Sequence, residues 1–118
     1  MVTSMLQQEE SLDRVLHALA DGSRRRIVER LSTGSASVSD LARPLPITLA
    51  AVVQHVQVLE SAGLVRTRKV GRVRRCELRM EALRPVDRWI SERKSMWAEA
   101  FDRLGAVLAD ETEGERDT

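Results

Sequence analysis

The sequence predicts a mainly α-helical domain that carries one small β-hairpin. Leucine, valine, isoleucine and alanine recur at helical spacing along most of the chain, which has 118 residues and only three aromatic ones. Residues 64–78 differ, because they are rich in β-branched residues and have Gly71 at a turn. A chain of this length buries enough surface for one modest hydrophobic core, so we expect a single folded domain.

Two helices are expected in the first third of the chain. Apolar residues at i, i+3, i+4 and i+7 predict a helix from about Glu9 to Ala20. Its stripe consists of Leu12, Val15, Leu16 and Leu19. Either Asp21 or Ser23 is then placed to cap a second helix, from Arg24 to about Ser32.

The middle of the chain predicts a short helix, a turn and a longer helix. Val38 is expected to form a one-residue strand, and Ser39 is placed to cap a short helix that two prolines close. Thr48 is placed to cap the longer helix, which runs from Leu49 to about Ala62. Gly63 follows at the position of a left-handed C-terminal cap.

The longer helix has an apolar face and an opposite, uncharged polar face when its residues are placed at 100° intervals. The apolar face consists of Leu49, Val52, Val56 and Leu59. The opposite face consists of Ala50, Ala51, Gln54, Gln57 and Ser61, with Val53 and His55 at the borders. Small residues allow close approach to a groove, and a Gln amide pairs with adenine through N6 and N7. An ordinary surface helix has the same composition, so the helix alone leaves both interpretations open.

Two strands and a final helix are expected in the rest of the chain. Residues 64–69 and 73–78 predict the strands of a hairpin with a turn at residues 70–72. The helical period returns at Met80 and is expected to persist to about Ala109. The domain should therefore cover residues 9–109, between a flexible N-terminus at residues 1–8 and an acidic disordered tail at residues 110–118.

The net charge of +1 conceals an uneven distribution of charge along the chain. Residues 64–79 hold seven Lys and Arg residues against Glu77 alone. Such a basic segment predicts a polyanionic partner, although a solvated surface hairpin is the competing interpretation. Residues 24–26 are three further arginines, which either form a second basic patch or pair with Asp21 or Glu29.

A short helix, a turn, a second helix and a basic hairpin follow each other in the order of a winged helix-turn-helix. In that arrangement one helix enters the DNA major groove and the hairpin reaches the adjacent backbone or minor groove. Guanidinium groups bind phosphates through paired hydrogen bonds without reading sequence. The candidate DNA-binding residues are Ala51, Gln54, His55 and Gln57 on the helix, and Arg68, Arg72, Arg74 and Arg75 on the hairpin. For His55, a bond to a neighbouring carbonyl or exposure to solvent is an equal alternative.

The last helix carries more apolar surface than one small core requires, which predicts an interface. Pairing of the first and last helices between two copies would give a two-fold dimer that presents two groove helices about one DNA turn apart. The candidate interface residues are Leu12, Val15, Leu16, Ile90, Trp97, Phe101, Leu104 and Leu108. The alternative is that the stripe only covers the core of the monomer.

Several other classes of protein are disfavoured by the sequence. The chain has two His residues, one Cys and no Gly-rich phosphate loop, so few of its residues are suited to catalysis. We expect no cofactor and no metal. Cys76 is expected to be a small buried apolar residue, with a reactive thiol or an intermolecular disulfide as alternatives. No run approaches the ~20 apolar residues of a membrane span, and no signal-peptide pattern is present, so we expect a cytoplasmic protein with no membrane partner.

Four short motifs resemble those of the ArsR-type (ArsR/SmtB) winged-helix repressors. They are ALADGSRRRI, VSDLA, QHVQVL and AGLV, within a match that spans residues 12–90. The resemblance implies a bacterial dimeric transcription factor, usually a repressor, that binds a pseudo-palindromic operator and dimerises through its first and last helices. It also implies a recognition helix from Thr48 to Ser61, with Thr48, Gln54 and His55 facing DNA, and a wing from Val65 to Leu78.

The sequence departs from the family pattern in two ways. Val53 stands where the family branch usually has a small hydroxyl residue, and Gln57 stands where it has a Lys, which shifts the electrostatic contribution to the wing. The regions that carry ligands in metal-sensing members contain no Cys or His here, which indicates a branch without the usual metal ligands. No inducing ligand or other effector follows from the sequence.

We therefore expect a homodimeric DNA-binding transcriptional regulator, a repressor, that binds a short inverted repeat in double-stranded DNA. The alternative is a winged-helix module that binds another protein through Ala50, Ala51 and Val58 and has no specific DNA binding. Val53 and Gln57 favour this alternative, whereas the charge of the hairpin opposes it.

Overall fold

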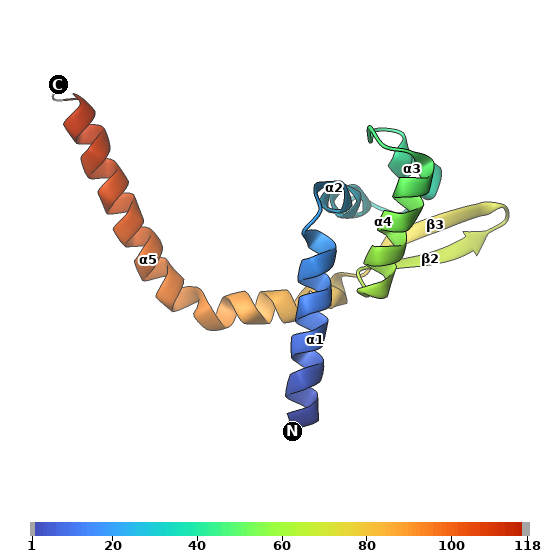
Figure 1. The fold of residues 1–118 in the computed structure, drawn as a ribbon, viewed down its shortest axis with the longest axis horizontal. Coiled ribbons are helices and arrows are strands. Elements are labelled where there is room, and N and C mark those ends of the chain that lie inside the picture. The colour runs from blue at the N-terminus through green and yellow to red at the C-terminus, as the bar shows by residue number, and fades with distance from the viewer. Residues whose placement is uncertain (1, 117–118) are drawn as a thin grey trace. The chain divides into compact units, whose positions relative to one another are not determined.

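The structure is a computed structural model that describes the backbone of residues 2–116 and the side chains of residues 5–111. The chain divides between Val86 and Asp87 into two compact units. The helices and strands are α1 (Val2–Leu19), α2 (Gly22–Leu31), β1 (Ala36–Ser37), α3 (Val38–Ala42), α4 (Leu49–Ser61), β2 (Val65–Val70), β3 (Val73–Leu78), the 3₁₀ helix η1 (Met80–Leu83) and α5 (Arg84–Arg116) (Figure 1). The predicted fold class, mainly helical with a small hairpin, is confirmed.

Both ends of the chain are more helical than the sequence predicted. Helix α1 begins at Val2, earlier than the predicted start near Glu9, and so runs through residues 2–8. Helix α5 continues to Arg116, beyond the predicted end near Ala109. Residues 1, 117 and 118 lie outside the described residues. Both helices extend further than predicted because Glu and Gln favour helices on exposed surfaces without forming an apolar stripe.

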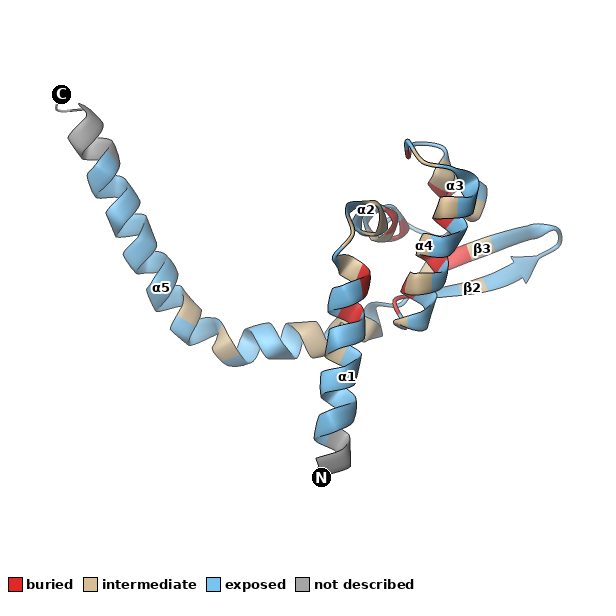
Figure 2. Cartoon of the chain, viewed as in Figure 1, coloured by how far each residue is buried: buried red, intermediate tan, exposed pale blue. Residues whose placement is uncertain are grey.

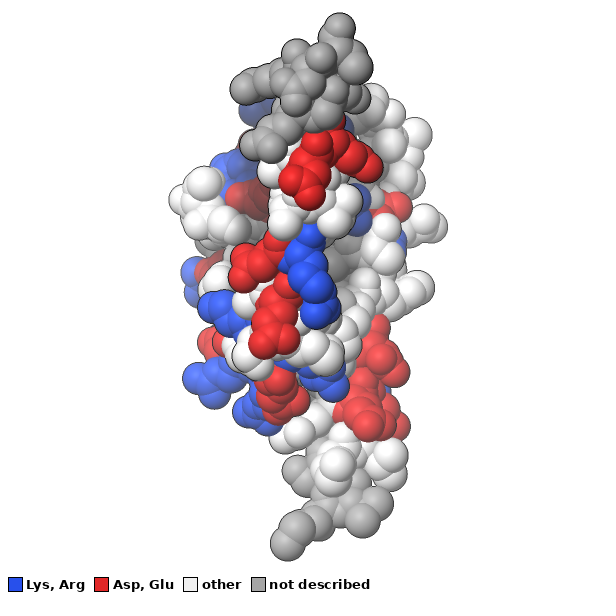
Figure 3. Space-filling view, turned by 90° about the vertical axis from the view of Figure 1, so that its left-hand side faces the viewer, with Lys and Arg blue, Asp and Glu red and all other residues white. Residues whose placement is uncertain are grey.

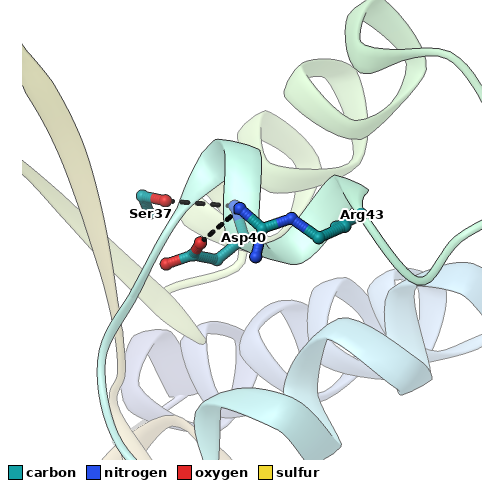
Figure 4. Close-up of polar contacts among 3 residues, drawn as sticks. All are labelled: Ser37, Asp40 and Arg43. Atoms are coloured by element: carbon teal, nitrogen blue, oxygen red, sulfur yellow. Dashed lines mark hydrogen bonds and ion pairs between the residues drawn. The ribbon is translucent and has the colours of Figure 1, made fainter.

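The first strand and the cap of α3 lie one to two residues earlier than predicted. Ala36 and Ser37 form β1, and Ala36 pairs with Cys76 of β3, whereas Val38 already belongs to α3. Ser37, not Ser39, caps the helix, because its hydroxyl accepts a hydrogen bond from the backbone N of Asp40 at 3.0 Å (Figure 4). This is the pattern of a capping box, in which an acidic side chain follows three residues after the cap.

The buried core lies within the first unit, among α1 to α4 and the base of the sheet (Figure 2). Its buried members are Val15, Ala18, Ile27, Leu31, Ala36, Leu41, Leu45, Val52, Val56, Leu59, Leu64, Val65 and Cys76. Val52, Val56 and Leu59 follow the predicted apolar face of α4. Leu49 was also assigned to that face but is 54% exposed, because it is the first residue of α4 and extends past the core.

The β2–β3 hairpin extends from the core as a two-stranded arm (Figure 1). The three strands are antiparallel, in the order β1-β3-β2. Val70 pairs with Val73, so the connection is the two-residue turn of Gly71 and Arg72. Gly71 has a φ of 64°, which a glycine adopts without strain. The base of the hairpin is therefore anchored in the core while its tip is exposed (Figure 2).

Candidate nucleic-acid interface

Helix α4 presents an uncharged surface over most of its length. The hydroxyl of Thr48 accepts a hydrogen bond from the backbone N of Ala51 at 3.1 Å, which caps the helix as predicted. Gln54 and Gln57 are exposed, and Ala51 is half-buried. The charged residue of this helix, Glu60, lies in its last turn. The exposed face therefore offers amide donors and acceptors without a fixed charge.

The His55 side chain contacts another residue of the protein and is only partly exposed to solvent. Its Nδ1 lies 3.3 Å from Nη1 of Arg24, and the imidazole is half-buried. Nδ1 is the acceptor in this bond, because an arginine can only donate. The sequence placed His55 among the residues that face DNA, but in the structure one of its ring nitrogens is engaged within the protein. Its position at the border of the α4 face was the only signal of this contact.

Arg24 connects three helices rather than forming a free basic patch. Its Nε donates to the backbone O of Ala18 at 2.7 Å, and its Nη2 donates to the backbone O of His17 at 3.2 Å. Nη1 of Arg25 similarly donates to the backbone O of Leu19 at 2.7 Å. Both guanidinium groups thus bind carbonyls at the C-terminal end of α1, where the helix dipole favours positive charge. The sequence suggested two roles for residues 24–26, a basic patch or ion pairing, and neither includes these bonds to carbonyls.

Asp21 caps α2 and holds the turn that brings Arg24 into place. Its Oδ1 accepts hydrogen bonds from the backbone N of Ser23 at 2.8 Å and of Arg24 at 3.1 Å. The bond from the Arg24 backbone is the main reason that the pKa of the Asp21 carboxyl lies below its ordinary value. Of the two predicted caps, Asp21 is the one that forms.

The hairpin places cations opposite each other on both of its faces. Arg68 lies opposite Arg75, and in the next register position Lys69 lies opposite Arg74. Successive residues of a strand point to opposite faces, so each face carries one pair of like charges. Directly opposed like charges destabilise a sheet. An anion bound at either pair would relieve that repulsion.

Three of the four predicted hairpin arginines also have partners within the protein. Nη2 of Arg68 lies 3.1 Å from Oε1 of Glu77. Nη1 of Arg74 donates to the hydroxyl of Thr67 at 3.1 Å, and that hydroxyl donates to the Glu60 carboxylate of α4. Nη2 of Arg75 donates to the backbone O and the hydroxyl of Ser35, at 3.2 and 3.1 Å.

Arg72 and Lys69 differ from these three arginines. Within residues 5–111, neither side chain has a hydrogen bond or an ion pair. Both lie at or beside the exposed turn of the hairpin. Their charges are therefore available for an external anion without the loss of an internal bond.

Cys76 lies at the base of the hairpin and is fully buried. It is opposite Thr67 on one side and Ala36 on the other. Burial raises the pKa of its thiol above the ordinary value, and Glu60 raises it further. The thiol therefore stays protonated near neutral pH, as expected for a small core residue.

The apolar residues of α5 remain largely exposed within its own unit. Ile90, Phe101, Leu104 and Leu108 are 42%, 65%, 52% and 53% exposed. Trp97 is half-buried because Trp89 packs against it edge to face, with ring centroids 5.3 Å apart, and Arg93 stacks 4.3 Å from the Trp89 ring. On the face of α5 that Figure 3 shows, Lys and Arg side chains lie beside Asp and Glu side chains.

The first-helix residues assigned to the interface have different environments. Leu16 is 47% exposed and Leu12 is half-buried. Val15 is only 1% exposed, because its side chain packs in the core. Its assignment to an intermolecular interface is therefore corrected to the core.

The described residues form neither a cluster of metal ligands nor a membrane-spanning helix. Among the described residues, no group of three or more His, Cys, Asp or Glu side chains is arranged to hold a metal ion. No helix in that part of the chain is both long and apolar enough to cross a membrane.

Known proteins share both the sequence and the arrangement of these elements. Residues 19–68 match the model of a family described as a helix-turn-helix domain. The chain is 43% identical over 99 residues to the HTH-type transcriptional regulator Rv2034 of Mycobacterium tuberculosis, covering 80% of this chain and 92% of that protein. The crystal structure of an ArsR family transcriptional regulator superposes with a TM-score of 0.71 at 40% identity, over 76% of this chain and 93% of the other. The chain belongs to the ArsR family.

The ArsR-family assignment confirms the resemblance found in the sequence. Proteins of this family are transcriptional regulators, so the chain is a DNA-binding regulator rather than an enzyme. Helices α3 and α4 form its helix-turn-helix, and the hairpin is its wing. A solution structure described as a homodimeric winged helix-turn-helix DNA-binding domain, from Mycobacterium bovis, superposes with a TM-score of 0.58 at 27% identity, over 86% of this chain and 88% of the other.

Proposed function

We propose that this ArsR-family protein is a homodimeric repressor that binds a pseudo-palindromic operator. Helix α4 enters the major groove and the hairpin binds the phosphate backbone beside it. The observation that carries the proposal is that α4, which exposes the amides of Gln54 and Gln57, packs against the hairpin that carries the opposed cation pairs. Amides read base edges, whereas guanidinium groups on phosphates fix the register.

The individual residues have distinct proposed roles. Gln54 and Gln57 bind base edges, Ala51 allows the helix to approach them, and Thr48 meets the DNA at the start of α4. His55 has one nitrogen bound to Arg24, so its remaining Nε2 is the atom that would reach a phosphate or a base. Phosphates are bound by Arg68, Arg72, Arg74 and Arg75, with Arg72 the most available because its guanidinium has no partner among residues 5–111.

The proposed dimer rests on the exposed apolar side chains of α1 and α5. Leu12 and Leu16 on the first helix, with Ile90, Trp97, Phe101, Leu104 and Leu108 on the last, are the proposed contacts. An exposed apolar stripe of this length is typical of an interface. The homodimeric state of the Mycobacterium bovis relative supports the same assembly here. A two-fold dimer presents two copies of α4 to half-sites about one DNA turn apart.

The proposed regulator acts on chromosomal DNA in the cytoplasm and uses no metal. Its effector is not specified by the chain. The two regions that supply metal ligands in metal-sensing relatives contain no Cys or His. Release from the operator is therefore proposed to depend on something other than a metal bound at those regions.

The proposal is tested by fluorescence anisotropy of labelled DNA. The full chain is titrated into a fragment from upstream of its own gene, and into a scrambled fragment of equal length, at several salt concentrations. We expect a preference of ~10³-fold or more for the first fragment, with a steep salt dependence. Light scattering of the same sample should give the mass of two chains. A monomer, or a protein that shows no preference for any fragment in a genome-wide selection, would refute the proposal.

One observation favours a second candidate function, the binding of a protein partner. Leu49 and Val53 are 54% and 39% exposed on α4, beside Ala50. Their apolar surface would suit a protein better than a DNA groove. Reversing two hairpin charges separates the two functions, because it removes DNA binding and spares an apolar protein contact.

A further inference from the structure

An open groove lies between α1 and α4 in the first unit. It has a volume of about 540 Å³. Arg14 and His17 line it from α1, and Gln54, Gln57 and Ser61 line it from α4, over an apolar floor that includes Val58. Both glutamines also belong to the exposed face of α4, so the groove continues directly into the proposed base-reading surface.

The groove is suited to an anion. Its walls carry a guanidinium, an imidazole, two carboxamides and a hydroxyl, and no carboxylate is among the residues that line it. The ion pair of Arg14 with Glu10 is long, at 3.9 Å, and the two side chains are 65% and 68% exposed. Exposed ion pairs of this kind hold their partners weakly. The guanidinium is therefore free to turn toward a ligand in the groove.

The groove and the hairpin lie on different sides of α4. Val58 faces the groove, whereas Glu60 accepts the hydrogen bond from Thr67 of the hairpin. Two helical steps of 100° separate these residues by about 200° around the helix axis. Figure 1 shows the same arrangement, with α1 on one side of α4 and the hairpin on the other.

We propose that the groove binds a phosphate of the DNA backbone, so that the protein contacts DNA on both sides of α4. A helix with its side chains is about 10–12 Å across and the major groove is about 12 Å wide, so a helix in the groove has a phosphate strand along each side. The hairpin binds one strand. Arg14 and His17 bind the other, and Gln54 and Gln57 lie between them.

This inference rests on the proposed function, and it adds two residues of α1 to the DNA interface. The test compares wild type with the double variant Arg14→Gln, His17→Gln by anisotropy, on the upstream fragment and on the scrambled one. Phosphate contacts do not read sequence, so we expect ~5- to 10-fold weaker binding to both fragments at moderate salt, and a salt slope smaller by about one unit. Arg14→Lys should retain most of the affinity, because it keeps the charge.

The control variant is Arg103→Gln, which removes the same charge from an exposed position on α5. It should leave both affinity and slope unchanged. Circular dichroism and light scattering establish that each variant is folded and has the mass of wild type. If wild type prefers its operator and the double variant binds with the same affinity and slope, the groove has no role and this inference is wrong while the proposed function stands. If wild type shows no specific binding, both are wrong.

Discussion

Helix α4 and the β2–β3 hairpin are neighbours, but the exposed face of α4 is mostly uncharged whereas the hairpin is strongly basic. The exposed face of α4 carries amides and small residues, and the charge of this helix is confined to Glu60 in its last turn. The hairpin carries six Lys and Arg residues and only Glu77 as an acid in residues 65–78. A surface without fixed charge binds phosphates weakly but orients precise hydrogen bonds to bases. In the proposed function, affinity and sequence reading are therefore divided between the two elements.

The like charges of the hairpin lower the stability of the isolated protein. The Arg68–Arg75 and Lys69–Arg74 pairs each place like charges directly opposite one another, which is destabilising. Contacts with Glu77, Thr67 and Ser35 offset part of that cost. These partners hold three arginines in place, whereas the tip remains free. The hairpin thus combines a fixed base with an available tip.

Reversing charge at the tip should have the largest effect. In Lys69→Glu, Arg72→Glu, the two tip cations most available to phosphates become anions, and we expect DNA binding to weaken by ~100-fold or more on every sequence. Neither side chain has an internal bond among residues 5–111, so the fold should be unaffected. Anisotropy on specific and scrambled fragments measures the effect. The matched control is Arg88→Glu, Arg103→Glu on α5, and a loss of equal size in that control would attribute the effect to net charge alone.

The corresponding change on α4 should alter sequence preference. Gln54→Ala removes a proposed adenine contact, and we expect operator binding to weaken by about 1–3 kcal/mol, with relaxed preference at one base pair. Binding to scrambled DNA should be unchanged, which serves as the internal control. Anisotropy on operators substituted at each position locates the affected base pair. An equal loss on scrambled DNA would show that Gln54 does not read a base.

A single hairpin arginine should have a smaller and sequence-independent effect. Arg74→Ala removes one proposed phosphate contact, so affinity should fall on all sequences and the salt slope should decrease by about one unit. Because Arg74 also donates to Thr67, Thr67→Val is the control for an indirect effect through the hairpin. If Thr67→Val reproduced the change in slope, the role of Arg74 would be positional rather than direct.

The order of the elements and most of the core could be predicted from the sequence, because both depend on local signals. Caps at Thr48 and Asp21, the left-handed Gly63 and the turn at Gly71 are each specified by one or two residues. The ends of α1 and α5 could not be predicted, because polar helix formers leave no apolar pattern. The cap of α3 was misplaced because residues 37 and 39 are both serines and only the pairing of β1 with β3 distinguishes them.

The candidate site was predicted less completely than the fold. The sequence identified the exposed amides and the basic hairpin, which follow from periodicity and charge. It did not reveal that His55 meets Arg24, or that Arg75 meets Ser35, because those partners are separated by 31 and 40 residues. Nor did it reveal the groove, because Arg14 and Gln54 are brought together only by helix packing. Long-range polar contacts have no local signature in one sequence.

The stability of the protein should depend modestly on pH in the acid range, because Asp40 lies in the first turn of α3. The Ser37 hydroxyl is the main reason that the pKa of the Asp40 carboxyl lies below its ordinary value, and Arg43, 3.3 Å away, lowers it further (Figure 4). A pKa lowered by folding stabilises the protein above the unfolded pKa, and this contribution is lost as the pH falls below about 4. Asp40→Asn cannot titrate, so its melting temperature should fall less steeply than that of wild type between pH 5 and pH 2.5. Equal dependence of melting temperature on pH in the two proteins would contradict a lowered pKa of Asp40.

The base of the hairpin should be chemically inert, in contrast to its tip. Cys76 is 0% exposed and burial raises its pKa, so neither access nor a thiolate favours reaction. We expect a thiol reagent to label the native protein only at the rate of unfolding, and DNA affinity to be the same in reductant and in mild peroxide. The denatured protein is the positive control for labelling. A loss of affinity on oxidation that Cys76→Ala abolished would instead make this cysteine a redox switch, and the hairpin would then respond to signals at its base as well as bind DNA at its tip.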